Sequence, residues 1–320
     1  MSTASKSIRP DKRAFSLLEI LVAMVILALI VIALAAISTE AGRIWKMTEA
    51  LNQRRSTGRA LLQFIARDLE MAVRQLPYPQ SNAPNLHFVA NEPSLIPTTL
   101  LNPHAAFWQA PVAADRSKGD LAEIGYFVRW DTTTQPGTAK AQLCRFFVDP
   151  ADDTHYRVYS SDEDGKPVNW LESATINQVA PATAPHGYRG WFADNVIALW
   201  LRCLDKHGDP ILKTAAGTSL NGGCGFDSRQ GFEITSTGLK QTGPALPTSV
   251  EVVLVTVDDH LAKKITAPLL ASPGSPENFW KDRTTTGSLA HFVAGLPPEI
   301  RPGVQVFSTR VVLKASFSSR

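Results

Sequence analysis

Cysteine is scarce in this sequence: 320 residues contain three, Cys144, Cys203 and Cys224. Three cysteines are too few for a scaffold held together by disulfides. The chain is 44% hydrophobic, which is an ordinary globular composition. A chain of this length and composition can bury a core of its own in one or two domains. Stability must therefore come mainly from apolar burial.

Net charge is also low once the first 14 residues are set aside. The sequence has 32 Lys and Arg residues against 29 Asp and Glu residues. Residues 1–14 contain four of the basic residues and one of the acidic residues, so 28 of each sign remain. A neutral body gives no electrostatic basis for contact with a phosphate backbone. We therefore predict no nucleic-acid partner.

Patterns typical of metal sites and catalytic sites are absent. The seven histidines are scattered and none has a metal-ligand spacing such as HExxH. No GxSxG nucleophile pattern occurs, and the glycine-rich residues 221–228 lack the Lys and Ser or Thr of a phosphate loop. The acidic clusters at 149–153 and 161–165 could offer oxygens to calcium but lack EF-hand spacing. We expect no metal, no cofactor and no enzymatic activity.

One long apolar run is present, at residues 15–37. It contains 23 residues, and Glu19 is its only charge. About 20 apolar residues at a rise of 1.5 Å per residue cross a bilayer core, so this length predicts a transmembrane helix. A charge inside such a helix costs roughly 2.5 kcal/mol or more, so Glu19 is expected to have a specific partner.

The first 14 residues, MSTASKSIRPDKRA, form a polar and basic leader. A secretory signal peptide places its apolar region before the small residue at the cleavage site, whereas here the apolar region follows Ala14. One interpretation is a plain signal anchor, whose basic flank stays in the cytoplasm.

The residues KRAFSLLEILVAMVIL support a second interpretation, because they resemble the type IV prepilin motif. In that family a small residue precedes Phe, and Glu is the fifth residue of the mature chain. The resemblance implies cleavage by prepilin peptidase between Ala14 and Phe15, and N-methylation of Phe15. It further implies that Glu19 pairs with an N-terminal ammonium group during assembly. Ala14 departs from the glycine that the family usually has at this position.

Residues 38–76 remain compatible with a helix and contain no proline until Pro77. Steps of three and four residues between apolar or small positions indicate one amphipathic stripe. We predict that the helix continues to Leu76, and that its second half, residues 60–76, lies against a sheet. Gly42 and Gly58 are its weak points, because glycine costs about 1 kcal/mol relative to alanine in a helix.

Residues 77–320 are predicted to form a β-rich globular domain outside the cytoplasm. We expect irregular chain over 77–120, with at most a short strand at 86–90, and a pairing of 156–160 across the turn at 161–167. A short helix is expected at 258–265. Strands are expected at 122–130, 143–149, 195–203, 249–257 and 303–315. The expected fold class is α+β, a long N-terminal helix packed on an antiparallel sheet.

A wider resemblance rests on the order of several segments. The chain is similar to the J-type minor pseudopilins of type II secretion, to the W-type minor pilins, and most of all to the Verru_Chthon cassette protein C family. The segments are residues 105–111, 124–130, 192–202, 246–259 and 306–316.

This resemblance implies a structural subunit with a single membrane pass. The helix would lie in the inner membrane, with the domain in the periplasm or cell envelope. Partners would be other pilin-like subunits, prepilin peptidase, the inner-membrane assembly platform and membrane lipid. The alternative is a membrane-anchored periplasmic binding module that does not assemble.

Cys203 and Cys224 lie 21 residues apart, on either side of a polar segment. In an oxidising compartment a bridge between them would contribute roughly 3 kcal/mol. Alternatively, Cys203 is buried in its strand and Cys224 carries a free thiol. Cys144 lies in a strand pattern and is expected to be a buried, small apolar residue.

Overall fold

The computed structural model describes most of the chain. The described ranges are 17–74, 85–112, 119–133, 137–160, 168–181, 189–211, 225–229, 232–235, 238–241, 245–269 and 289–314. The chain divides into two compact units, residues 1–56 and 57–320, which are described separately below. The leader 1–14, the predicted cleavage residues Ala14 and Phe15, the predicted turn at 161–167 and Cys224 all lie outside the described residues.

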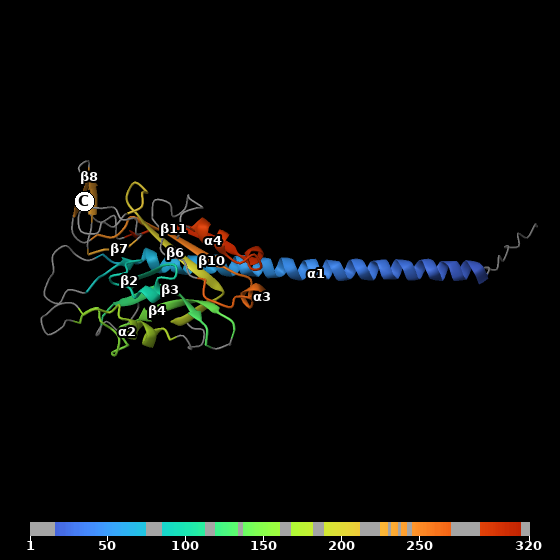
Figure 1. Cartoon of the computed structure of the whole chain (residues 1–320), viewed down its shortest axis with the longest axis horizontal. Helices are drawn as coiled ribbons and strands as arrows, with labels where there is room; N and C mark the ends of the chain where they lie inside the picture. Colours follow the sequence, from blue (N-terminus) through green and yellow to red (C-terminus); the bar gives the residue numbers. More distant parts are fainter. Residues whose placement is uncertain are drawn as a thin grey trace, which may run out of the picture. The chain divides into compact units, whose positions relative to one another are not determined.

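Helix α1 (Leu17–Glu70) is the longest element, with 54 residues (Figure 1). Its residues up to Ser56 belong to the first unit, and the residues from Thr57 onward belong to the second. No proline interrupts it, as its sequence predicts. In the second unit the buried side of α1 follows the predicted stripe, which comprises Gly58, Leu62, Ile65, Leu69 and Ala72 just beyond the helix end.

The helix ends at Glu70, six residues before the predicted end at Leu76. Met71 and Ala72 form tight backbone hydrogen bonds to residues three positions back. The N–H of Val73 then donates to the carbonyl of Gln109, 3.0 Å away. The helix ends here because the backbone of Val73 bonds to strand β2 (Ala105–Pro111) instead of continuing the helix. This contact joins residues far apart in the sequence, so helical periodicity does not predict it.

The larger sheet has six strands in the order β5-β4-β3-β2-β1-β7. All of its pairings are antiparallel. The strands are β1 (Val89–Ala90), β2 (Ala105–Pro111), β3 (Leu121–Asp131), β4 (Lys140–Val148), β5 (Gly190–Asp194) and β7 (Phe226–Asp227).

A second antiparallel sheet has three strands in the order β11-β10-β6. These are β6 (Val196–Leu204), β10 (Ser249–Thr256) and β11 (Gln305–Val312). A separate two-stranded hairpin pairs β8 (Phe232–Thr235) with β9 (Gly238–Gln241). The observed fold is therefore α+β, a long helix followed by a mainly antiparallel sheet domain, as predicted.

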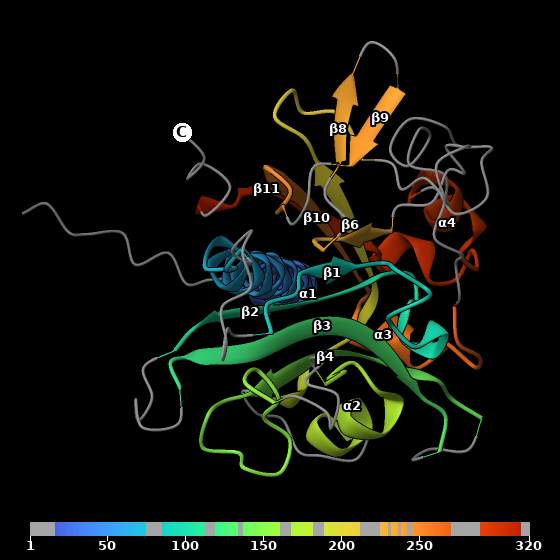
Figure 2. The same ribbon diagram turned by 90° about the vertical axis from the view of Figure 1, so that its left-hand side faces the viewer.

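The main core lies between the last turns of α1 and both sheets, which Figure 2 shows with α1 seen nearly end-on. Leu62, Ile65 and Leu69 of α1 are 6% exposed or less. Their partners alternate along the strands, so that Trp108 of β2 and Tyr126 of β3 face this core. The prediction that the second half of the helix lies against a sheet is confirmed.

Short helices cover the outer faces. α2 (Ser173–Val179) packs under the larger sheet around Phe107 and Trp170. α3 (Asp259–Ala262) and α4 (Leu289–Gly295) lie against the far face of the smaller sheet. The short 3₁₀ turns are η1 (Thr98–Leu100) and η2 (Arg301–Gly303).

A buried ion pair fastens α1 to the larger sheet. Asp68, on the buried side of α1, accepts hydrogen bonds from Arg145 Nη2 at 2.8 Å and from Tyr126 Oη at 2.6 Å. Arg145 lies over the rings of Phe147 and Phe64, at 4.5 and 5.1 Å from their centroids. Both charges are thus buried with partners, which a buried ion pair requires.

Several strand predictions are confirmed and others are wrong. β3, β4, β6, β10, β11 and α3 fall at their expected positions. Within 77–120, however, the chain forms β2, a strand in the interior of the sheet that we expected to be irregular. β5 and α2 were also not expected. Residues 156–160 form turns and coil rather than a strand, and the Val158 carbonyl accepts from the Asn85 N–H. The expected pairing across the turn at 161–167 is present as one backbone hydrogen bond, from the Val168 N–H to the Ser160 carbonyl at 3.2 Å.

Candidate functional site

The first part of α1 is apolar and exposed. Residues Leu17–Trp45 form a helix of 29 residues that is long and apolar enough to cross a membrane, and none of its most apolar stretch is buried within the chain. Leu17 is 87% exposed and Leu27 is 61% exposed. An exposed apolar surface of this length is stable only where lipid or another protein surface shields it from water. The segment therefore fits a single-pass membrane anchor.

Glu19 lies in the first turn of this helix. A carboxylate there complements the partial positive charge at the helix N-terminus. It is also the only charged residue of α1 before Glu40. The proposed cleavage and methylation residues, Ala14 and Phe15, lie outside the described residues and remain predictions.

The other end of the apolar segment is marked by polar side chains. Glu40 and Arg43 form an exposed pair at 4.0 Å, with side chains 60% and 81% exposed. Trp45 is 74% exposed. Charges and an aromatic side chain are the groups expected at a membrane–water interface. The apolar stretch is thus bounded on the side of the globular domain.

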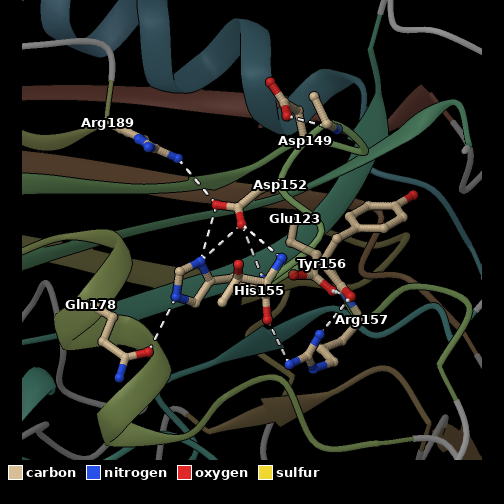
Figure 3. Close-up of polar contacts among 10 residues, drawn as sticks. Glu123, Asp149, Asp152, His155, Tyr156, Arg157, Gln178 and Arg189 are labelled. Carbon is tan, nitrogen blue, oxygen red and sulfur yellow. Dashed lines mark hydrogen bonds and ion pairs between the residues drawn. The ribbon is translucent and has the colours of Figure 1, made fainter.

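A polar cluster on the domain joins the connection after β4 to α2 (Figure 3). His155 Nδ1 lies 3.0 Å from Asp152 Oδ1, and His155 Nε2 lies 3.2 Å from Gln178 Oε1. Arg189 Nη1 donates to Asp152 Oδ2 at 3.3 Å. Burial tends to raise the pKa of Asp152, but hydrogen bonds from His155 hold this pKa below its usual range. Both ring nitrogens of His155 are engaged, so this cluster fastens the chain.

Glu123 is the most deeply buried acid near this cluster. Its residue exposure is 0%, and Oε1 accepts a hydrogen bond from the Arg157 N–H at 3.1 Å. Oε2 has no hydrogen-bond partner among the described residues. Burial disfavours the charged carboxylate and raises the pKa of Glu123 to about 8.

Two histidines are buried in the domain. His104 is fully buried, its Nδ1 accepts the Leu201 N–H at 2.8 Å, and burial lowers its pKa to about 3. His87 Nε2 lies 2.7 Å from Asp227 Oδ1 and has a pKa lowered by burial. These histidines are neutral groups that satisfy buried hydrogen bonds.

The acidic cluster at 149–153 forms no metal site with other residues in the described part of the chain. No group of three or more His, Cys, Asp and Glu side chains is arranged there to hold a metal ion. In 149–153, Asp149 bonds to the N–H of Ala151, and Asp152 bonds as described above. Residues 161–165 lie outside the described residues.

The cysteines give no reactive site among the described residues. Cys144 is fully buried, as predicted, and burial raises the pKa of its thiol to about 11. Cys203 is buried in β6. Cys224 lies outside the described residues, so the Cys203–Cys224 bridge stays a prediction.

Sequence reasoning did not find the polar groups that matter most in the domain. Asp68 follows Ile65 by three residues and precedes Leu69, so its place on the apolar stripe was a readable signal of a buried charge. Glu123 similarly stands within an apolar strand. Their partners, Arg145 and Arg157, are far along the chain and carry no comparable signal.

Comparison with protein families places a known motif at the N-terminal end of the chain. Residues 9–35 match the family model described as the prokaryotic N-terminal methylation motif. The match spans the leader end, the predicted cleavage residues, Glu19 and most of the apolar segment. No curated protein matches the chain. The match supports a pilin-like or pseudopilin-like subunit that is processed at its N-terminus.

Proposed function

We propose that this chain is a non-enzymatic structural subunit, a minor pilin or pseudopilin-like component of a type IV pilus or type II secretion-type envelope filament. Prepilin peptidase would cleave it between Ala14 and Phe15, and the new N-terminus on Phe15 would be methylated. The mature helix would enter a filament made with other pilin-like subunits, at the inner-membrane assembly platform.

One observation carries the proposal: the methylation motif at 9–35 includes the start of a helix whose apolar side chains are all exposed over Leu17–Trp45. A plain anchor needs an apolar helix but has no need of Phe after a small residue, or of a carboxylate five residues into the mature chain. A filament subunit needs all three, because its helix is covered first by lipid and then by other helices.

Glu19 is assigned the assembly role. Cleavage would create an ammonium group at Phe15, and a carboxylate in an apolar surrounding is stabilised by such a cation. If the cation belongs to a neighbouring subunit, the pair would set the depth at which the incoming helix joins. The globular domain would then lie in the periplasm or cell envelope, with the helix in the inner membrane.

The proposal that the chain is a minor subunit, rather than a pilin-like subunit of another kind, rests only on the order in which several sequence segments occur in the domain. The segments on which the resemblance to the J-type minor pseudopilins, the W-type minor pilins and the Verru_Chthon cassette protein C family rests overlap β2, β3, β6, β10, β11 and the end of β5. The choice among these families is part of the proposal.

The test is a Glu19→Ala substitution in the native host. We expect normal insertion into the membrane, but at least a tenfold loss of cross-linking to other pilin-like subunits, since a tenfold change corresponds to only about 1.4 kcal/mol. The matched control is Glu40→Ala, which removes an exposed acid of the same helix. Equal cross-linking in all three proteins would contradict the assembly role and favour the anchored binding module.

A further inference from the structure

The connection that follows β4 crosses the domain as a strap, which we define as residues 149–160. Three consecutive strap residues bond to other segments. Tyr156 Oη donates to the Leu121 carbonyl at 2.8 Å, and the Arg157 N–H donates to Glu123 Oε1 at 3.1 Å. The Val158 carbonyl accepts from the Asn85 N–H at 2.6 Å. Three successive strap residues thus hold the strap to the domain, and Glu123 accepts the hydrogen bond of the middle one.

Burying the charged form of Glu123 under this strap costs free energy. A fully buried carboxylate that accepts one backbone hydrogen bond and leaves its other oxygen unsatisfied is strongly destabilised in its charged form. When protonated, the same carboxyl still accepts the Arg157 N–H and loses its charge. The closed strap therefore favours the protonated acid, whereas an open strap admits water and favours the carboxylate.

We propose that Glu123 makes the strap a pH-sensitive clamp, closed over a protonated carboxyl and opened increasingly as the pH rises. Opening would separate Val158 and Tyr156 from Leu86 and Leu121, the small apolar cluster beneath the strap. An apolar surface would then become available on the domain in response to the surrounding pH. This device is independent of whether the chain assembles into a filament.

The charged surroundings of Glu123 are consistent with this direction. Arg157 favours the charged carboxylate, but Asp152 opposes it and burial outweighs both. Tyr156 interacts electrostatically with Glu123 and is neutral, because burial raises the pKa of its hydroxyl. The register partners of Glu123 on the adjacent strands, Gln109 and Val148, carry no charge.

Linkage gives the expected size of the effect. The ordinary carboxyl pKa of 4.5 applies to the open strap, and the pKa of about 8 applies to the closed strap. Between these values the closed form binds one more proton than the open form. Opening should therefore become about tenfold more favourable for each pH unit, and the effect should level off above pH 8.

The test is hydrogen–deuterium exchange of the full chain in detergent micelles at about pH 5.5 and about pH 7.5, corrected for the intrinsic effect of pH on exchange. Wild-type strap amides should lose about 100-fold in protection between these two values, by the same linkage. Glu123→Gln should remove this loss, because its amide cannot ionise. Glu172→Gln removes an exposed acid next to α2 and should behave like the wild type.

Equal pH dependence in wild type and Glu123→Gln, or none in the wild type, would overturn the proposal. If Glu123→Gln does not fold, infrared spectroscopy of the wild type decides. A protonated carboxyl band that persists above about pH 6 and fades as the strap loses protection supports the clamp. Loss of every such band at ordinary carboxyl pH values would overturn it.

Discussion

At Gly58, a Cβ atom would lie 2.3 Å from the ring of Phe307. This distance is far below a van der Waals contact, so the missing side chain is what lets β11 approach α1. Gly42, in the other unit, has no neighbouring atom within 4 Å of the same position. The absence of a side chain is therefore required by packing at Gly58 but not at Gly42, although the sequence alone presents both glycines as weak points of the helix.

We expect Gly58→Ala to destabilise the domain by up to about 2 kcal/mol, because overpacking costs about 1–3 kcal/mol and the gain in helix propensity offsets only about 1 kcal/mol of this cost. Urea unfolding of the full chain in micelles, followed by tryptophan fluorescence, measures this. Gly42→Ala is the matched control and should be neutral or stabilising. A Phe307→Ala background should remove the cost of Gly58→Ala, and persistence of that cost would contradict the packing explanation.

His104 is a residue whose effect depends on pH. Its pKa is about 3 in the folded domain, against an ordinary value of 6.5 for the unfolded chain, so the folded chain binds fewer protons between these values. This group therefore contributes stability that is present above pH 6.5 and is lost as the pH falls toward 3. The loss is about 1.4 kcal/mol per pH unit.

We expect His104→Asn to remove this loss, because the amide oxygen of asparagine can accept the Leu201 N–H without titrating. Glu123 contributes with the opposite sign between pH 4.5 and 8, so the measurement is the difference between variant and wild type. The free energy of unfolding of the wild type should fall relative to the variant by about 1.4 kcal/mol for each unit below about pH 6. Parallel pH profiles would show that His104 does not titrate on unfolding.

At the scale of elements, the contact between α1 and the larger sheet depends on the buried pair of Asp68 and Arg145. Their side chains are 8% and 6% exposed and 2.8 Å apart. Leu62, Ile65 and Leu69 could slide along an apolar surface at modest cost, but Asp68 can meet Arg145 and Tyr126 in one register only. The pair thus specifies how the helix lies on the sheet.

We expect Arg145→Ala to destabilise the domain by about 3–5 kcal/mol, because it leaves Asp68 buried without its cation. The control is Lys314→Ala, which removes the exposed partner of Glu70 at the same end of α1. An exposed pair contributes about 0–1 kcal/mol, so the control should change urea unfolding little. Similar effects of the two substitutions would contradict the role of the buried pair.

The elements also show what could be predicted from the sequence. The helix, its buried stripe and the strands β3, β4, β6, β10 and β11 follow from periodicity and β-branched or aromatic composition. β2 was missed because its Pro-rich and Asn-rich surroundings favour irregular chain, while the strand is fixed by pairing on both sides. The end of α1 was misplaced for the same reason, since Val73 bonds to Gln109 of β2.

The candidate sites divide in a similar way. The N-terminal motif and Glu19 could be identified because they are encoded in contiguous residues. The Asp152–His155–Gln178 cluster, the strap and the acid beneath it could not, because they join residues from separate parts of the chain. Burial converts Glu123 from an ordinary acid into a proton-holding group, and burial is a property of the folded domain.

At the scale of the whole molecule, the chain contains one unit that buries its apolar side chains and one helix segment that does not. The domain from Thr57 onward has its own core between two sheets. The segment Leu17–Trp45 is not covered by any other described part of the chain, so we infer that its partners are lipid or other chains. We propose that these partners are first lipid and then other processed subunits.

The most direct test is mass spectrometry of the mature N-terminus, on protein purified from its own host. We predict that the chain begins at Phe15 and carries one methyl group on its amine, with residues 1–14 removed. Ala14→Leu is the control and should retain the leader, because a large residue replaces the small one at the cleavage site. A wild-type chain that keeps residues 1–14 intact would contradict the account.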